Sequence, residues 1–233
     1  MKNTIYYCCL LFLLFAAPWF ASAQSKEKAA YKYLLYVPKK ETKPGQKYPL
    51  IIYLHGSSQR GQDLTKLKTY GLPYLIEQGR DFEFIIASPQ CPAGKLWSTD
   101  NWLEPLYEEL IAKYPVDTSR VYLTGISMGG GGTFDVAKDY PDRFAALVPL
   151  CAWNSDTTRL CSLRHVPIWT FHGTNDEQVP LVAETQSKVA ALRQCQGNIR
   201  LTTLKNEGHY IQWLYEQQGT YDIYEWMLRH KKP

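Results

Sequence analysis

One serine of this sequence stands in a pattern that prepares a hydroxyl for nucleophilic attack. Residues 125–129 read Gly-Ile-Ser-Met-Gly and follow an apolar segment at 121–123. A strand-to-helix turn this tight strains the backbone of its serine, and glycines on either side remove the side chains that would collide. We therefore predict that Ser127 is a nucleophile at the carboxyl end of a sheet, where the N-terminus of the next helix favours negative charge.

A serine nucleophile needs a base, and that base needs an acid to orient it and stabilise its charged form. Asp176 and His209 come after Ser127 in the chain, and each follows a predicted strand. Glu177 is the alternative acid, but Asp176 lies one residue nearer the strand end and suits a tight turn. We predict Ser127, Asp176 and His209 as the catalytic residues.

Other histidines compete with His209 for the role of base, namely His55, His165, His172 and His230. His55 and His172 each precede a glycine at a strand end, which is typical of a structural histidine that hydrogen-bonds a loop. The other two lie before a strand and near the C-terminus. His209 is preferred because it follows the last predicted strand and adjoins a glycine that lets the loop bend.

Two backbone N–H groups are expected to bind the oxyanion that develops during attack on a carbonyl. One belongs to Met128, directly after the nucleophile. The other belongs to Ser57, in the glycine-bearing loop at 55–61 that follows a buried strand.

Substrate contacts are predicted from the loops beside the elbow strand. Trp97 and Trp153 lie in loops after the flanking strands, where an aromatic face can stack on a sugar ring or a phenolic acid. Ordinary packing of both tryptophans under the loops is the alternative. Gln178 and Asn154 are further candidate contacts.

The segments that must position these residues alternate between strands and helices. Predicted strands cover 31–37, 48–54, 82–88, 120–126, 144–150, 166–171 and 199–204. Predicted helices lie within 63–78, 103–114, 130–140, 181–194 and 221–230. This alternation predicts an α/β fold, with a mostly parallel central sheet and helices on both faces. Functional groups of such folds gather at the carboxyl ends of the strands.

The N-terminus has the features of an export signal. Lys2 precedes an apolar segment at 5–15, and Ala21-Ser22-Ala23 is a small-residue cleavage site. We expect residues 1–23 to be a signal peptide and residues 24–233 to form one catalytic domain, secreted or periplasmic and without a membrane span after cleavage. A membrane anchor is the alternative, but the apolar segment is short for a span. The net charge of +4 is too small and dispersed to indicate nucleic acid as a partner.

Export would place four cysteines of the mature chain in an oxidising compartment: Cys91, Cys151, Cys161 and Cys195. Four cysteines allow three pairings. Nearness in sequence favours Cys151 with Cys161, which leaves Cys91 with Cys195, and buried free thiols are the alternative. None of the four has the spacing of metal ligands, so we predict no metal and no cofactor.

Several motifs together resemble the α/β-hydrolases: the His55-Gly56 loop with Gly61, the 125–130 elbow, the stretch 172–176 and Gly208-His209. Within that superfamily the chain is similar to secreted single-domain esterases, which include polyhydroxybutyrate-depolymerase-like, feruloyl and acetylxylan esterases and allied predicted peptidases. The resemblance covers the chain from about Tyr33 onward. It implies an α/β-hydrolase fold and a serine carboxylic-ester hydrolase that deacylates plant polysaccharide, with a small-molecule or oligosaccharide ester as substrate.

Two alternatives to an esterase remain open. One is a serine peptidase of the prolyl-oligopeptidase type that uses the same residues. The other is a catalytically silent hydrolase fold that binds carbohydrate.

Overall fold

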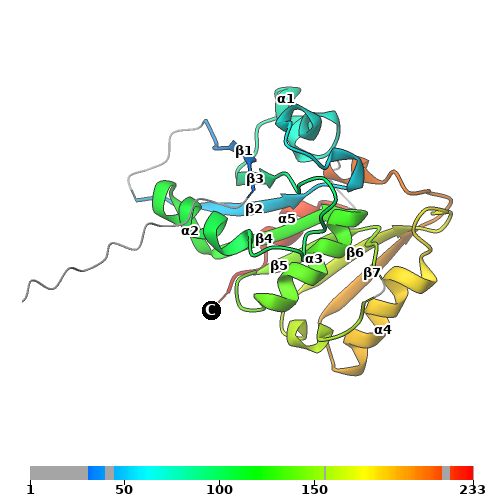
Figure 1. Cartoon of the computed structure of the whole chain (residues 1–233). Helices are drawn as coiled ribbons and strands as arrows, with labels where there is room; N and C mark the ends of the chain where they lie inside the picture. The colour runs from blue at the N-terminus through cyan, green and yellow to red at the C-terminus, as the bar shows by residue number, and fades with distance from the viewer. Residues whose placement is uncertain (1–30, 40–44, 155, 217–220, 233) are drawn as a thin grey trace, which may run out of the picture.

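A computed structural model describes residues 31–39, 45–154, 156–216 and 221–232 (Figure 1). The expected signal peptide at 1–23 lies outside the described residues. Among the residues that are described, seven strands form one sheet in the order β1-β3-β2-β4-β5-β6-β7. β1 pairs with β3 antiparallel, and the other neighbours pair parallel. The strands are β1 (Tyr33–Tyr36), β2 (Tyr48–Leu54), β3 (Ile85–Pro89), β4 (Val116–Ile126), β5 (Ala146–Leu150), β6 (Ile168–Gly173) and β7 (Ile199–Leu204).

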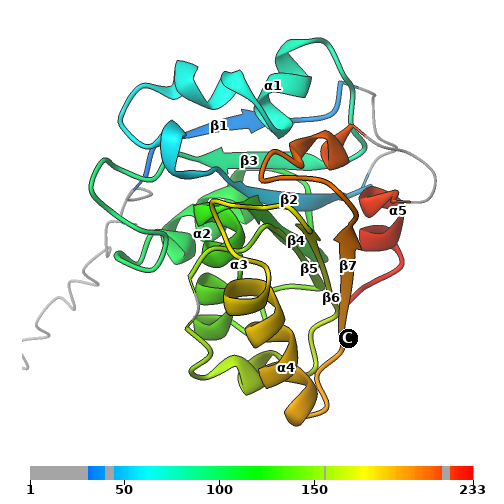
Figure 2. The same ribbon diagram turned by 90° about the vertical axis from the view of Figure 1, so that its right-hand side faces the viewer.

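The sheet is covered on both faces. α2, α3 and α4 lie on one face, and α1 and α5 lie on the other (Figure 2). The α-helices are α1 (Leu72–Glu77), α2 (Leu103–Lys113), α3 (Met128–Asp139), α4 (Ser187–Gln194) and α5 (Ile223–Leu228). Shorter turns are the 3₁₀ helices η1 (Ser57–Gln59), η2 (Leu64–Thr69), η3 (Leu160–Leu163) and η5 (Gln212–Tyr215), and the π-helical turn η4 (Val182–Gln186). No helix in the described part of the chain is long and apolar enough to cross a membrane.

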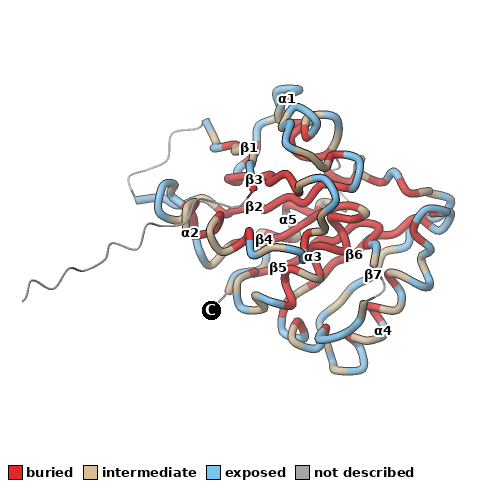
Figure 3. The backbone as a smooth tube through the Cα atoms, viewed as in Figure 1, coloured by how far each residue is buried: buried red, intermediate tan, exposed pale blue. Residues whose placement is uncertain are grey.

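The packing of β2 explains why the central strands have continuous apolar sequences. Leu50, Ile52 and Leu54 pack into the cluster under α2 and α3. Ile51 and Tyr53 point the other way, into the cluster under α1 and α5. Because successive side chains of a strand alternate between faces, a strand covered on both sides needs apolar residues at every position. Figure 3 shows the result, with buried strands inside and exposed residues on the outer turns and loops.

The predicted α/β fold with a mostly parallel sheet is confirmed. Strands predicted at 48–54 and 199–204 match β2 and β7 to the residue, and the remaining strands differ at their ends. The helix predicted at 181–194 is divided into η4 and α4. Its first part winds more widely, since the Gln186 N–H donates to the carbonyl of Leu181, five residues earlier.

The predicted disulfide pairing is wrong. Cys161 bonds to Cys195, whereas Cys91 and Cys151 are buried free thiols. Between Cys151 and Cys161 the chain leaves the carboxyl end of β5 and returns toward the amino end of β6, so residues close in sequence lie at opposite ends of the sheet. The chain also runs through α4 toward the amino ends of the strands, and this brings Cys195 close to Cys161 in η3.

Loss of this disulfide should destabilise the domain, because it closes a loop between residues 34 apart. Replacing Cys161 and Cys195 together with serine is expected to lower the free energy of unfolding by about 4 kcal/mol. Urea unfolding measures the loss. Dithiothreitol should produce a similar loss in the wild-type protein and none in the double variant. A double variant as stable as the oxidised wild type would contradict the prediction.

Candidate active site

Ser127 occupies a strained turn between β4 and α3. Its backbone has φ 58° and ψ −119°, which is unusual for a residue that carries a side chain. A Cβ on Gly129 would lie 2.0 Å from the carbonyl oxygen of Leu54, and one on Gly125 would lie 2.5 Å from that of Gly129. The two glycines of the motif are therefore required by the close approach of α3 to the end of β2.

His209 and Asp176 form a buried pair from the loops that follow β7 and β6. The His209 Nδ1–H donates to Asp176 Oδ2 over 2.7 Å. The other carboxylate oxygen, Oδ1, accepts from the N–H groups of Gln178 at 3.0 Å and Val179 at 2.8 Å. Burial opposes ionisation of Asp176, but the hydrogen bonds from His209 and Val179 outweigh it and lower the pKa of this carboxyl. A charged Asp176 keeps the proton of His209 on Nδ1 and leaves Nε2 as the acceptor.

Ser127 and His209 line one open cavity of about 280 Å³. It lies at the carboxyl end of the sheet, and Asp176 lies behind His209, away from the opening. Ser57 and Gln178, both predicted as site residues, also line it. The full lining is Gly56, Ser57, Ser58, Thr69, Tyr70, Ile126, Ser127, Gln178, His209, Tyr210 and Gln212.

The two residues whose backbone N–H groups are predicted to bind an oxyanion each stand at the start of a helix. Ser57 is the first residue of η1 and Met128 the first of α3. N–H groups in the first turn of a helix have no acceptor within it and can bind an external oxygen. Gly56 permits this arrangement, because a Cβ there would lie 2.8 Å from Tyr70 Oη and 3.6 Å from Ser127 Cβ.

Two buried glutamines that the sequence analysis missed hold the Ser57 loop in place. The amide of Gln59 donates to the carbonyl of Lys66 and to Thr69 Oγ1, each over 3.0 Å. The amide of Gln90, from the end of β3, donates to the carbonyl of Gln59 over 2.9 Å. Glutamine has no sequence signature for this role, since only the folded loop brings its partners, which are mostly backbone carbonyls, close to it.

The two tryptophans predicted to contact substrate have different environments in the structure. Trp97 is 1% exposed, packs against Trp102 and donates its indole N–H to the carbonyl of His55 over 3.2 Å. It lies in the core and supports the His55 loop. Trp153 is 41% exposed, and its backbone N–H donates to the carbonyl of Ser127 over 3.2 Å. With Met128 and Trp97 it lines a separate small hollow, and neither tryptophan is among the residues that line the main cavity.

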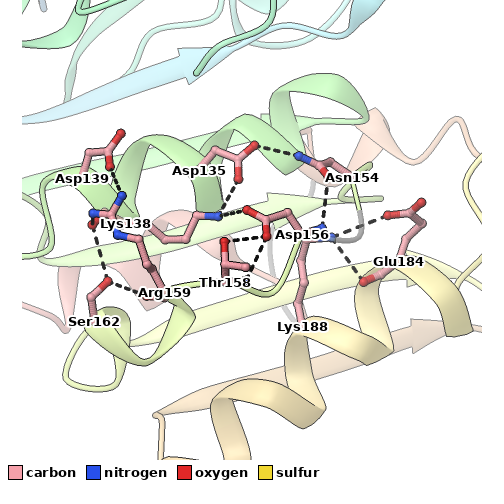
Figure 4. Close-up of polar contacts among 10 residues, drawn as sticks. All are labelled: Asp135, Lys138, Asp139, Asn154, Asp156, Thr158, Arg159, Ser162, Glu184 and Lys188. Carbon is pink, nitrogen blue, oxygen red and sulfur yellow. Dashed lines mark hydrogen bonds and ion pairs between the residues drawn. The ribbon is translucent and has the colours of Figure 1, made fainter. Parts of the chain in front are cut away.

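Buried ion pairs fix the loop that carries Trp153 to α3 (Figure 4). The Lys138 side chain is 6% exposed and binds Asp135 at 2.9 Å and Asp156 at 2.6 Å. Burial lowers the pKa of Lys138, but the hydrogen bonds that its ammonium donates to both carboxylates outweigh burial and raise that pKa. Asn154 reaches the same cluster, donating to Asp135 over 3.1 Å. Its side chain hydrogen-bonds protein atoms, and its contact with substrate stays a prediction.

His55 and His172 are structural, as predicted. His55 Nε2 accepts from the Cys91 N–H over 3.0 Å, so its proton lies on Nδ1, which donates to the carbonyl of Gly56 over 2.6 Å. His172 is fully buried and contacts Thr185 and Val179 through its two ring nitrogens.

The neutral state of His55 predicts acid sensitivity of the fold. Burial lowers the pKa of His55 to about 4, below its unfolded value of 6.5. The unfolded chain therefore binds a proton first as pH falls, and about 3 kcal/mol of stability should be lost between pH 6.5 and pH 4. Urea unfolding across this range measures the slope. His55→Gln should flatten it and the exposed His165→Gln should not, while equal slopes in all three proteins would refute the assignment.

Comparisons with known proteins show which proteins this chain is similar to. A family model described as PET hydrolase-like matches residues 107–230. The chain is 29% identical over 135 residues to a bifunctional acetylxylan esterase/xylanase of Neocallimastix patriciarum, covering 55% of this chain and 19% of that protein. It is 28% identical over 167 residues to poly(3-hydroxyalkanoate) depolymerase C of Paucimonas lemoignei, covering 59% of this chain and 38% of that protein. The chain thus spans less than half the length of these two relatives.

The fold is shared with solved esterase structures. A thermostable esterase matches with a TM-score of 0.70 at 28% identity, over 86% of this chain and 59% of that chain. Together with the sheet order and the elbow, this match confirms the predicted α/β-hydrolase fold.

Proposed function

The chain belongs to the PET hydrolase-like family, and from this premise we propose that it is a serine carboxylic-ester hydrolase that works through an acyl-serine intermediate. The observation that carries the proposal is the 2.7 Å hydrogen bond between His209 Nδ1 and Asp176 Oδ2, together with the cavity that His209 lines with Ser127. A serine, a base beside it and a buried acid behind that base are the groups that acyl transfer requires.

In the proposed mechanism, Ser127 Oγ attacks the ester carbonyl while His209 Nε2 accepts its proton. The carbonyl oxygen becomes an oxyanion, which the N–H groups of Ser57 and Met128 bind. The intermediate collapses as the bond to the alcohol breaks, and His209 returns the proton to that leaving oxygen. Water then attacks the acyl-serine with His209 again as base, which releases the carboxylic acid and restores Ser127.

The substrate we propose is an acetyl or feruloyl ester of plant polysaccharide or its fragments. One relative carries acetylxylan esterase in its name. Gln178 lines the cavity, and Trp153 next to Met128 offers a half-exposed ring for stacking on a sugar or a phenolic acid. The cavity of about 280 Å³ suits one small acyl group rather than a long chain.

A polyester is the second candidate substrate. The family description and the poly(3-hydroxyalkanoate) depolymerase relative both favour it. A polyester has the same carbonyl chemistry, and exposed apolar side chains such as those of Trp153 and Tyr210 can contact its surface.

Ser127→Ala should abolish ester hydrolysis, since it removes the attacking oxygen. We expect a fall in kcat of roughly 10⁵-fold with unchanged thermal unfolding. The assay panel contains an acetylated xylo-oligosaccharide, an alkyl ferulate, a short-chain aryl ester, a polyester film and a proline-containing peptide. A fluorophosphonate probe should label the wild type and the remote Ser162→Ala variant, but not Ser127→Ala.

Each arm of this panel separates one hypothesis from the others. Release from the sugar or ferulate substrates supports the leading substrate class, and erosion of the film alone supports the polyester. Cleavage of the peptide alone would identify a peptidase. Full activity in Ser127→Ala would overturn the mechanism, and a wild-type protein without labelling or turnover would be a silent binding protein.

We also propose that residues 1–23 direct export and that the mature domain covers 24–233. A disulfide between Cys161 and Cys195 supports this, because such bonds persist in oxidising compartments. Mass spectrometry of the exported protein should find Gln24 at its N-terminus and one intact disulfide. Protein retained in the cytoplasm with Met1 in place would contradict the proposal.

A further inference from the structure

A second buried histidine lies on the far side of Asp176 from the cavity. Ligand-type atoms of Cys151, His172 and Asp176 lie within 4.8 Å of one another, and all three residues are buried. The proposed mechanism uses only Asp176. The other two come from the end of β6 and from the residue after β5, so the fold places them there by strand pairing rather than by sequence proximity.

The contacts of His172 determine which ring nitrogen carries its proton. Nε2 lies 2.8 Å from the carbonyl oxygen of Val179, which can only accept, so Nε2 must carry the hydrogen. Burial lowers the pKa of His172 and keeps the ring neutral. Nδ1 is then unprotonated and accepts from the hydroxyl of Thr185 over 2.8 Å. Both nitrogens are occupied, which leaves no lone pair for a metal ion.

The same Nε2–H group also lies close to the carboxylate of Asp176. His172 Nε2 lies 3.2 Å from Asp176 Oδ2, and both side chains are fully buried. Oδ2 is also the oxygen that binds His209 Nδ1 at 2.7 Å. It is therefore placed between the positive edges of two imidazole rings.

Val179 connects the two residues through its backbone. Its N–H donates to Asp176 Oδ1 over 2.8 Å, and its carbonyl accepts from His172 Nε2 over 2.8 Å. His172, Val179 and Asp176 thus form a closed set of contacts, in which moving any one member disturbs the other two.

We propose, on the premise of the function given above, that His172 is a positioning residue that holds Asp176 Oδ2 toward His209 and draws part of its negative charge away from that base. With His172 present, the carboxylate is fixed and moderately basic. Without the Nε2–H group, Asp176 loses one of the contacts that stabilise its charge and binds the protonated form of His209 more strongly.

Other groups face this cluster and must stay constant in any test. The Cys151 thiol hydrogen-bonds Asp176 and lies 3.6 Å from the carbonyl oxygen of His209. Lys188 of α4 is buried and contributes positive charge near His172, and Glu184 partly compensates it. The substitutions below leave Cys151, Lys188 and Glu184 unchanged.

The test is the pH profile of kcat/KM on an aryl ester, for wild type, His172→Leu and His172→Gln. His172→Leu should move the acid limb to higher pH by a few tenths of a unit, because a more basic carboxylate favours protonated His209. It should lower kcat roughly tenfold with KM nearly unchanged, since Asp176 is held less firmly. His172→Gln retains an N–H near the position of Nε2 and should stay close to wild type in both respects.

Two further variants keep the proposal open to refutation. Thr185→Val preserves the ring but removes the hydroxyl that polarises it, and should shift the limb in the same direction by less, even if His172→Leu fails to fold. His55→Gln removes a buried histidine that does not contact Asp176, and should leave the limb in place.

An unmoved or lowered acid limb in His172→Leu and Thr185→Val would overturn the proposal, as would equal defects in His172→Leu and His172→Gln. If Ser127→Ala is inactive while these limbs stay fixed, only the role of His172 is refuted. Activity in Ser127→Ala would refute the proposed function itself.

Discussion

The contact between the start of α3 and the end of β2 is the constraint on which the site depends. A Cβ on Gly129 would lie 2.0 Å from the carbonyl oxygen of Leu54, so helix and strand meet backbone to backbone. The run of glycines at 129–132 would cost an isolated helix about 1 kcal/mol per residue. Burial of this whole turn offsets that cost, because α3 packs against β4, β5 and β2. The same approach forces Ser127 to a positive φ and turns its side chain toward the cavity.

Each loop around Ser127 is held by a different kind of interaction. Side-chain amides hold the Ser57 loop, ion pairs of Lys138 hold the Trp153 loop, and the contacts of His172 hold the Asp176 loop. These groups are buried, where an unpaired polar atom is costly and where a satisfied network specifies one geometry. The loops thus have the fixed geometry that electrostatic stabilisation of a developing charge requires.

The strand pattern, the elbow and the meeting of Asp176 with His209 could be predicted from the sequence, because each leaves a local signal. Apolar runs mark β2 and β7, and the glycines of the elbow mark Ser127. The disulfide could not be predicted, since it depends on where the chain returns across the sheet. For Trp97 the sequence left both substrate contact and packing under the loop open, and only the folded loop shows that its ring turns inward under His55.

The three buried histidines differ in their hydrogen-bond partners, and these partners determine which role each ring can have. In His55 and His172 both ring nitrogens hydrogen-bond protein atoms, so neither ring has a free acceptor. His209 has one nitrogen bound to Asp176, and its ring borders the cavity with Ser127. A histidine acts as a general base only if one nitrogen is held by an acid and the other faces the reacting hydroxyl. That criterion is set by hydrogen bonding in the folded chain, and it supports our proposal that His209 is the base for Ser127.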